Sequence, residues 1–417
     1  MIQEEVSFSA LTFNMLSITI YRGVLDMPVT SRVLRLLESC AEKDYKTVYQ
    51  TCGELSSALL SGGGMKSLKQ AMAEEVLADD NIFTRLLAKG GTDNLNERLL
   101  ALAKRDLSVL YLAASNTAGM VKDFLSLNSL PLWDDSPADY PLDGEWDGCI
   151  SELAEFHQKN GVGQFVYCNA FLWKGNSLHP IANPDTIRLA DLKGYETQKK
   201  IVVDNTLAFL DGFEANNILL YGDRGTGKSS TVKALLNEYA DRKLRMIEMP
   251  KESLSELPEL TARLSEIPMK FIVFIDDLSF SGNDDNFSAL KAVLEGGLAS
   301  RPGNVLIYAT SNRRHLLRET FSDRSGDEVH HADTIQEAVS LSDRFGLFVT
   351  YLLPDKQRFL EIVSQMAKDR GLDCEQNKLL ALAERWALER GARSPRYARQ
   401  FISDMLAKLS RGESIDD

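Results

Sequence analysis

Two spacings of hydrophobic residues divide the chain into a helical part and a part in which strands and helices alternate. Between residues 1 and 127, apolar residues recur every three to four positions, as at Leu107 and Leu110, which predicts a mostly helical N-terminal domain. From residue 188 to 354, short unbroken apolar runs alternate with helical spacing. Such runs predict strands that are buried on both faces of a parallel sheet. Helical spacing returns in residues 355–417 and predicts a lid of three helices.

The segment between these parts, residues 128–187, predicts a connector with a small α/β element. It begins with a stretch rich in proline and aspartate, a composition typical of loops. Residues 148–160 have helical spacing, and the runs Phe165–Tyr167 and Ala170–Trp173 predict short strands. The expected fold class is therefore α/β, with a doubly wound parallel sheet between helical N-terminal and C-terminal domains.

A glycine-rich segment lies between the predicted strand Asn216–Tyr221 and the helix after it. Its sequence, GDRGTGKS, matches the phosphate-loop pattern G-x-x-x-x-G-K-[S/T]. The glycines let successive main-chain N–H groups converge on one point at a helix N-terminus. Lys228 is expected to reach the β- and γ-phosphates of ATP, and Ser229 to bind Mg²⁺. The predicted nucleotide-binding residues are Gly222, Asp223, Arg224, Gly225, Thr226, Gly227, Lys228, Ser229 and Ser230.

Polar residues also follow two later strands of the predicted sheet. The apolar run Phe271–Ile275 ends in Asp276 and Asp277. Carboxylates after such a strand hold Mg²⁺ and polarise the attacking water in phosphate-loop enzymes, so we expect Asp276 to bind the metal and Asp277 to activate the water. Asn312, after the strand Asn304–Ala309, is expected to hold the same water, with a turn-capping role as the alternative.

Two arginines are candidate contacts to the γ-phosphate. Arg344 precedes the last predicted strand, Phe348–Leu353, and is expected to act as an arginine finger on a neighbouring subunit. A surface salt bridge is the alternative. Arg396 lies in the first turn of the last predicted helix, from which it can swing over the nucleotide. Arg393 and Arg399 remain alternatives for this second role.

The order of these parts resembles that of the AAA+ ATPases, in which a phosphate loop, a Walker B element, a sensor 1 asparagine, an arginine finger and a helical lid with a sensor 2 arginine follow one another. More narrowly, GDRGTGKSS, IDDLSF, LEGGL, NVLIYATSNRRHL and LSDRFGL are similar to the bacterial family called domain of unknown function 815. The resemblance extends closely over about Leu178 to Leu409. It implies an ATP-binding AAA+ module and no known substrate. Asp277 stands where many AAA+ proteins have glutamate, and its shorter side chain implies slow hydrolysis.

Composition narrows the class of protein. The 417 residues are 44% apolar and 26% charged, as in globular proteins with more than one domain. The five cysteines are odd in number and include no CxxC pair, which argues against disulfides and a zinc site and favours the cytoplasm. No apolar run is long enough for a membrane span. The net charge of −13 disfavours indiscriminate nucleic-acid binding, although basic residues outnumber acidic ones between Arg385 and Arg411.

These features predict an ATP-driven switch or remodeller that self-associates into a ring or hexamer and binds a protein partner through its N-terminal domain. A threading unfoldase would need an aromatic–glycine pore loop, and Pro250–Pro268 contains neither residue type. A nucleic-acid loader that uses the arginine-rich lid remains open, as does a scaffold in which ATP only fixes the domain geometry. A metabolic kinase would need neither finger nor lid.

The pair His330 and His331 has too few further ligands nearby for a metal site.

Overall fold

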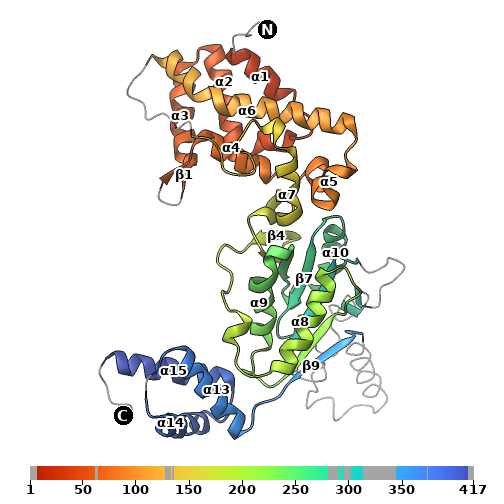
Figure 1. Ribbon diagram of the computed structural model, residues 1–417. Coiled ribbons are helices and arrows are strands. Elements are labelled where there is room, and N and C mark those ends of the chain that lie inside the picture. The colour runs from red at the N-terminus through yellow and green to blue at the C-terminus, as the bar shows by residue number, and fades with distance from the viewer. Residues whose placement is uncertain are drawn as a thin grey trace. The chain divides into compact units, whose positions relative to one another are not determined.

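A computed structural model of the chain describes residues 7–61, 64–126, 133, 136–279, 290–291, 293–294, 302–312, 344–372 and 374–411. The chain divides into two compact units, Met1–Cys168 and Asn169–Asp417 (Figure 1). The predicted connector, residues 128–187, is shared between them. Its helical part belongs to the first unit, and its strands Ala170–Lys174 and Ser177–Pro180 belong to the sheet of the second.

The first unit is a bundle of helices, as the spacing of apolar residues predicts. The long helix α6 packs against α1, α2 and α4. Its buried Asp106 accepts hydrogen bonds from the main-chain N–H groups of Thr19 (2.8 Å) and Ile20 (2.6 Å), so the turn after α1 is held by a buried carboxylate. The elements are α1 (Phe8–Leu16), η1 (Arg22–Asp26), α2 (Pro28–Glu42), α3 (Tyr45–Leu59), β1 (Leu60–Ser61), β2 (Gly64–Met65), α4 (Leu68–Leu77), α5 (Ile82–Gly90), η2 (Gly91–Asn94), α6 (Glu97–Leu125), η3 (Trp146–Gly148), α7 (Ile150–Asn160) and η4 (Gly163–Val166).

One predicted strand of this region is wrong. Residues Phe165–Tyr167, expected to be extended, form and follow the 3₁₀ turn η4. Phe165 and Val166 are buried, and Gly163 begins the turn with a φ of +59°. A short apolar run can be buried in a turn as well as in a strand, and periodicity cannot separate the two.

The second unit is built on a sheet of seven described strands in the order β4-β3-β6-β7-β8-β5-β9. All neighbours are parallel except the hairpin pair β3 and β4. The α/β fold is thus confirmed, with an antiparallel hairpin added at one edge. The strands are β3 (Ala170–Lys174), β4 (Ser177–Pro180), β5 (Ile218–Gly222), β6 (Leu244–Glu248), β7 (Lys270–Ile275), β8 (Val305–Ser311) and β9 (Leu347–Tyr351).

Helices pack against the strands of the sheet. Val202 of α8 and Val232 of α9 pack in one core with Ile218, Leu306 and Val349 of the strands. Helix α10 contacts β8. The elements are η5 (Leu189–Asp191), α8 (Glu196–Leu210), α9 (Lys228–Tyr239), η6 (Ala240–Arg242), η7 (Lys251–Glu256) and α10 (Leu257–Ser265).

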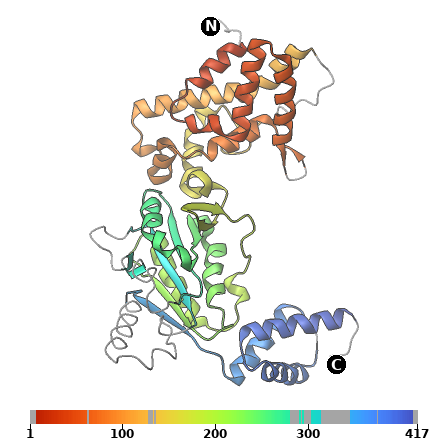
Figure 2. The same cartoon turned by 180° about the vertical axis from the view of Figure 1, so that it is seen from behind.

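Three helices follow the last strand and form the lid, as predicted; Figure 2 shows them in blue. The lid has a hydrophobic core of its own, which includes Phe359, Val363, Ala383 and Phe401. The side chain of Ser394 accepts a hydrogen bond from the N–H of Tyr397 and so caps the last helix. The helices are α13 (Lys356–Asp369), α14 (Gln376–Glu389) and α15 (Pro395–Ser410).

We expect Gly222→Ala to destabilise the second unit strongly. Gly222 has a φ of +133°, and a Cβ atom there would lie 2.1 Å from the carbonyl oxygen of Tyr351. The control is Gly212→Ala, where φ is +84° and no atom lies within 4 Å of the added Cβ. The first change should lower the free energy of unfolding by about 3 kcal/mol or more, and the second by about 1 kcal/mol. Calorimetric unfolding of both variants tests this, and equal losses would show that strand packing imposes no constraint at Gly222.

Candidate functional site

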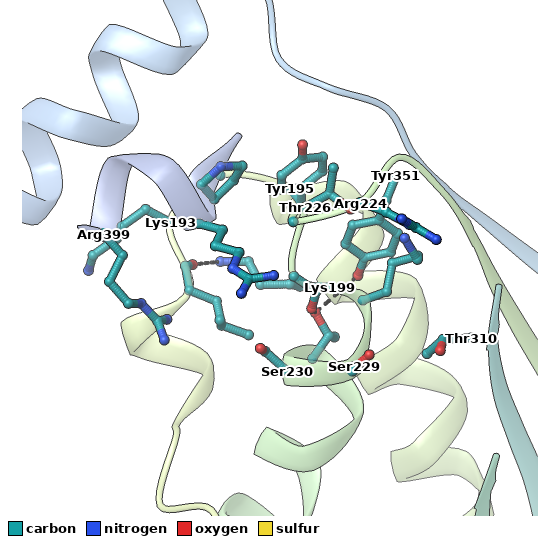
Figure 3. A pocket seen from close by; sticks show the side chains of 18 of the residues that line it. Lys193, Tyr195, Lys199, Arg224, Thr226, Ser229, Ser230, Thr310, Tyr351 and Arg399 are labelled. Atoms are coloured by element: carbon teal, nitrogen blue, oxygen red, sulfur yellow. Dashed lines mark hydrogen bonds between the residues drawn. The ribbon is translucent and has the colours of Figure 1, made fainter. Parts of the chain in front are cut away.

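The carboxyl ends of the strands border a cavity of about 590 Å³. Figure 3 shows side chains from the segment before α8, the phosphate loop and the lid around it. Residues far apart in the sequence therefore meet here, at the edge where parallel α/β sheets bind their ligands. The lining residues are Leu192, Lys193, Gly194, Tyr195, Lys199, Arg224, Gly225, Thr226, Gly227, Lys228, Ser229, Ser230, Thr231, Asp276, Asp277, Thr310, Asn312, Tyr351, Met366, Pro395, Arg396 and Arg399.

Lys228 begins α9 and is held inside the phosphate loop. Its Nζ donates hydrogen bonds to the carbonyl oxygens of Gly222 (2.9 Å) and Asp223 (2.7 Å) and to Oδ1 of Asn312 (3.2 Å). Burial lowers the pKa of Lys228, and the nearby carboxylates of Asp223, Asp277 and Asp276 oppose this shift. The lysine thus links the loop to the end of β8.

Two residues of the predicted phosphate loop lie behind the cavity instead of lining it. Gly222 meets the end of β9, and the Asp223 N–H donates to the carbonyl oxygen of Tyr351 (2.8 Å). The Asp223 carboxylate accepts a hydrogen bond from the N–H of Leu353 (2.7 Å). Asp223 therefore fastens the loop to the chain that leads into the lid, while Arg224 to Ser230 face the cavity.

The two aspartates after β7 have different partners. Oδ1 of Asp276 accepts a hydrogen bond from Ser229 Oγ (2.6 Å), whereas Oδ1 of Asp277 accepts one from Asn312 Nδ2 (2.7 Å). Asp277 has a φ of +51°, a conformation that residues other than glycine seldom adopt. The structure thus brings together the predicted metal pair and, separately, the predicted water-binding pair.

The residues present fit Mg²⁺. The Ser229 hydroxyl and the Asp276 carboxylate are hard oxygen donors in direct contact. Mg²⁺ prefers oxygen ligands, and in phosphate-binding sites it is bound through one or two carboxylates together with substrate phosphates. Ser229 and Asp276 are the residues that would hold it.

The lid reaches the phosphate loop at the start of α15. The N–H of Arg396 donates to the carbonyl oxygen of Gly225 (3.1 Å), and the side chains of Arg396 and Arg399 line the cavity. Arg393 instead forms a salt bridge with Glu384 (2.5 Å). Of the three arginines considered from the sequence, two therefore lie at the cavity and Arg393 does not.

Arg344 lies near the amino end of β9, and the cavity lies at the carboxyl ends of the parallel strands. It precedes β9, whose first residue, Leu347, pairs with Ile218, whereas its last residue, Tyr351, pairs with Gly222 at the cavity. The strand alone rises about 13 Å between these ends. Arg344 is therefore not part of the cavity of its own chain.

Several cavity residues have no signal in the sequence. The Tyr195 hydroxyl donates to the carbonyl oxygen of Leu352 (2.6 Å), and its ring packs on Tyr351 with 5.0 Å between centroids. Lys199 donates to the carbonyl oxygen of Leu192 (2.6 Å). Lys193, in the same segment, also lines the cavity. None belongs to a spaced motif; the only hint is their place just before α8 or in its first turn, ahead of the phosphate-loop strand.

Some expectations fall outside the described part of the chain. These are most of the helix that the spacing of Phe287, Leu290, Leu294 and Leu298 predicts, most of the segment LEGGL, the ends of IDDLSF and NVLIYATSNRRHL, the start of LSDRFGL, and the pair His330 and His331. Within the residues that the structure does describe, no helix has the length and apolarity for crossing a bilayer.

Strand order and motif positions together define the class of protein. Counted from the phosphate-loop strand β5 as the first, the five strands from β5 to β9 have the order 2-3-4-1-5 in the sheet. The phosphate loop follows strand 1, the aspartates strand 3, the asparagine strand 4, and the helical lid strand 5. This is a P-loop protein of the AAA+ class. The model of the family described as protein of unknown function (DUF815) matches residues 166–409, more than half of the chain. The chain belongs to this family, as its motifs predicted.

Solved structures similar to this chain include two variants of RuvB from Thermotoga maritima. They are 17% and 18% identical, cover 54% of this chain and 67% and 68% of theirs, and have TM-scores of 0.38 and 0.37. The Thermotoga maritima RuvB Holliday junction branch migration motor is 17% identical over 54% of this chain and 66% of that one, with a TM-score of 0.37. At these scores the likeness carries no argument, and the class rests on strand order and motif positions. No curated protein matches the sequence.

Proton uptake should accompany ATP binding at alkaline pH. Burial lowers the pKa of Lys228, so part of the free protein has a neutral lysine at a pH below the ordinary pKa, and a bound polyphosphate favours the charged form. Affinity should therefore be full at neutral pH and fall as the pH rises through the lowered pKa. Calorimetric titrations at about pH 9, in two buffers that differ in ionisation enthalpy, measure the uptake. ATP binding without proton uptake would contradict a pKa of Lys228 that is lowered in the free protein and raised by bound phosphate.

Proposed function

We propose that this protein is an ATP hydrolase that works as an oligomeric, ATP-driven switch or remodeller on a macromolecular partner. The observation that carries the proposal is the chain of hydrogen bonds from Lys228 through Asn312 to Asp277, all of which line the cavity. It joins a phosphate ligand, a water ligand and a carboxylate within one hydrogen-bonded group. Such a group can bind a triphosphate and prepare water for attack on it.

The charge of the cavity suits a polyphosphate. Six basic side chains line it against two carboxylates, those of Asp276 and Asp277. Within the described residues, the side chains of Arg224, Arg396 and Arg399 make no hydrogen bond or ion pair. Arginine stays charged and binds phosphate oxygens through a fork of donors. These three side chains are therefore available to the nucleotide.

The division of labour follows from the contacts. Ser229 and Asp276 would hold Mg²⁺, which when bound screens the charge on the phosphates. Lys228 would donate hydrogen bonds to the β- and γ-phosphate oxygens. Asp277 would accept the proton of the attacking water while Asn312 orients that water, as the phosphorus–oxygen bond to the leaving diphosphate breaks. Because an aspartate is shorter than the usual glutamate, we expect slow turnover.

Assembly would complete the site. Arg396 and Arg399 provide cations from the lid of the same chain, whereas Arg344 lies near the amino end of β9. An arginine placed there is far from the cavity of its own chain, so a contact with nucleotide would have to be made to a neighbouring copy. We therefore propose self-association into a ring or hexamer, with the helical N-terminal unit as the binding surface for a protein partner.

The lid gives less support to a nucleic-acid loader. Several of its arginines already have partners: Arg393 pairs with Glu384, Arg385 pairs with Glu389, and Arg390 lies over the ring of Trp386. The cysteines in the described part of the chain form no disulfide with one another, in keeping with the cytoplasmic location that we propose.

Substitutions of Lys228 and Asp277 should separate ATP binding from ATP hydrolysis. At one hundred times its dissociation constant, ATP should stabilise the wild type by about 2.7 kcal/mol. Lys228→Ala should abolish most of this stabilisation because the phosphate loses its main cation. Asp277→Asn keeps the shape of the side chain and removes its charge, so it should retain the stabilisation and lose hydrolysis. Thermal shift and phosphate release measure the two effects.

The control for these variants is Lys200→Ala, which removes an exposed lysine that pairs with Asp204 on α8, outside the cavity. It should keep both properties. An unchanged ATP-induced shift in Lys228→Ala would refute the phosphate site, and wild-type hydrolysis by Asp277→Asn would place the base elsewhere.

Arg344→Ala should bind ATP normally and fail to hydrolyse it, since known arginine fingers contribute roughly 10³–10⁵ in turnover. Mixing this variant with Lys228→Ala should restore part of the activity, because some interfaces then pair an intact finger with an intact phosphate loop. Activity per subunit should rise with protein concentration. A monomer with concentration-independent turnover, or no rescue in proven mixed assemblies, would refute a finger in trans.

A further inference from the structure

Thr310 of β8 lies between the two carboxylates of the site and contacts both residues that carry them. Its Oγ1 donates a hydrogen bond to Oδ1 of Asp276 (2.5 Å) and accepts one from the N–H of Asp277 (3.0 Å). The side chain is buried, with 2% of the residue exposed. A threonine hydroxyl has one proton to donate and can still accept, so both contacts are satisfied at once.

The main chain of Thr310 adds a third contact. Its carbonyl oxygen accepts a hydrogen bond from the N–H of Leu278 (2.7 Å). Together these bonds hold the turn after β7, in which Asp277 has a φ of +51°. Aspartate adopts this conformation more readily than most residues other than glycine, and the hydrogen bonds of the turn stabilise it here. The contacts with Thr310 therefore help to hold the main chain at Asp277, while the Asp277 carboxylate accepts its hydrogen bond from Asn312.

Oδ1 of Asp276 is also the atom that accepts from Ser229. The hydroxyl of Thr310 thus approaches the same oxygen as the phosphate-loop serine, from the side of β8. Two hydroxyl donors on one oxygen fix the rotation of the carboxylate. Asp276 is in this way oriented toward the phosphate loop.

We propose that Thr310 is the positioning residue of the site, and that its hydroxyl aims Asp276 at the divalent cation while it holds Asp277 against Asn312. The inference rests on the proposed ATPase function. Thr310 acts through the two aspartates. It is not one of the residues that accept a hydrogen bond from Lys228. Its hydroxyl should therefore matter for metal binding and turnover but not for binding of metal-free ATP.

The test uses the full-length protein with three substitutions. Thr310→Val removes the hydroxyl and keeps a β-branched shape suited to a strand, whereas Thr310→Ser keeps the hydroxyl. Thr206→Val is the matched control: Thr206 is also buried, and its hydroxyl bonds to Val202 (2.8 Å) and to Tyr308 (2.8 Å) on α8 and β8, outside the cavity lining.

Three measurements separate the roles: binding of a fluorescent ATP analogue in EDTA, binding of Mn²⁺ to the ATP-loaded protein by electron paramagnetic resonance, and turnover against Mg²⁺ concentration. Thr310→Val should bind the metal-free analogue like the wild type, bind Mn²⁺ about tenfold more weakly, as expected for one lost hydrogen bond to a charged group, and turn over more slowly. Thr310→Ser should recover most of both losses. Thr206→Val should change the melting temperature only.

Wild-type Mn²⁺ affinity in Thr310→Val would overturn the inference, and so would a serine variant as impaired as the valine variant, or an equal loss of Mn²⁺ binding in Thr206→Val. A wild type that binds no ATP in EDTA and no Mn²⁺ with ATP would instead overturn the proposed function itself, and the inference with it. The metal-free measurement on the wild type distinguishes the two failures.

Discussion

The parallel pairing of β5 with β8 on one side and β9 on the other is the constraint on which the site depends. It brings Leu220 opposite Thr310 and Gly222 opposite Tyr351, so the phosphate loop starts where both neighbouring strands end. Only a residue without a side chain fits at Gly222, because the Tyr351 carbonyl oxygen occupies the place of a Cβ atom. The loop therefore leaves the sheet at one defined height, and the groups on the neighbouring strands meet it there.

The side chain of Lys228 is a buried cation, and it lies beside polar groups that are exposed to the cavity. Lys228 is buried, whereas Asp276 and Asp277 are exposed. A buried ammonium group must be satisfied by the protein or by a ligand, and here two carbonyl oxygens and Asn312 accept its hydrogen bonds. Its desolvation lowers its pKa and strengthens its attraction to any anion in the cavity. The charges of the site are thus set in place by the fold and need little rearrangement.

The sequence predicts what depends on local pattern and fails where a contact comes from the register between distant strands. The phosphate loop, the two aspartates and Asn312 follow buried strands, and their spacing was enough to find them. Thr310 carries no such signal, because its partners are set by the pairing of β7 with β8. The sequence alone could not separate Arg393 from the other lid arginines, because its salt bridge with Glu384 depends on the packing of the lid helices. The strand Ala170–Trp173 was expected within a separate connector, but a short apolar run cannot say which strand it will pair with, and as β3 it extends the main sheet through β6.

The contact between the lid and the phosphate loop joins these features to the proposed switch. Arg396 contributes a main-chain N–H to Gly225 and a side chain to the cavity, so the first turn of α15 follows the position of the loop. A Cβ on Gly225 would lie 3.0 Å from Ser394 Oγ, which leaves little space between the two. A ligand that fills the cavity would contact both the loop and the lid. A ligand can shift a conformational equilibrium only by its difference in affinity for the two states. A nucleotide that contacts Lys228 on one side and the lid arginines on the other would bind with different affinity when the lid is close to the loop and when it has moved away.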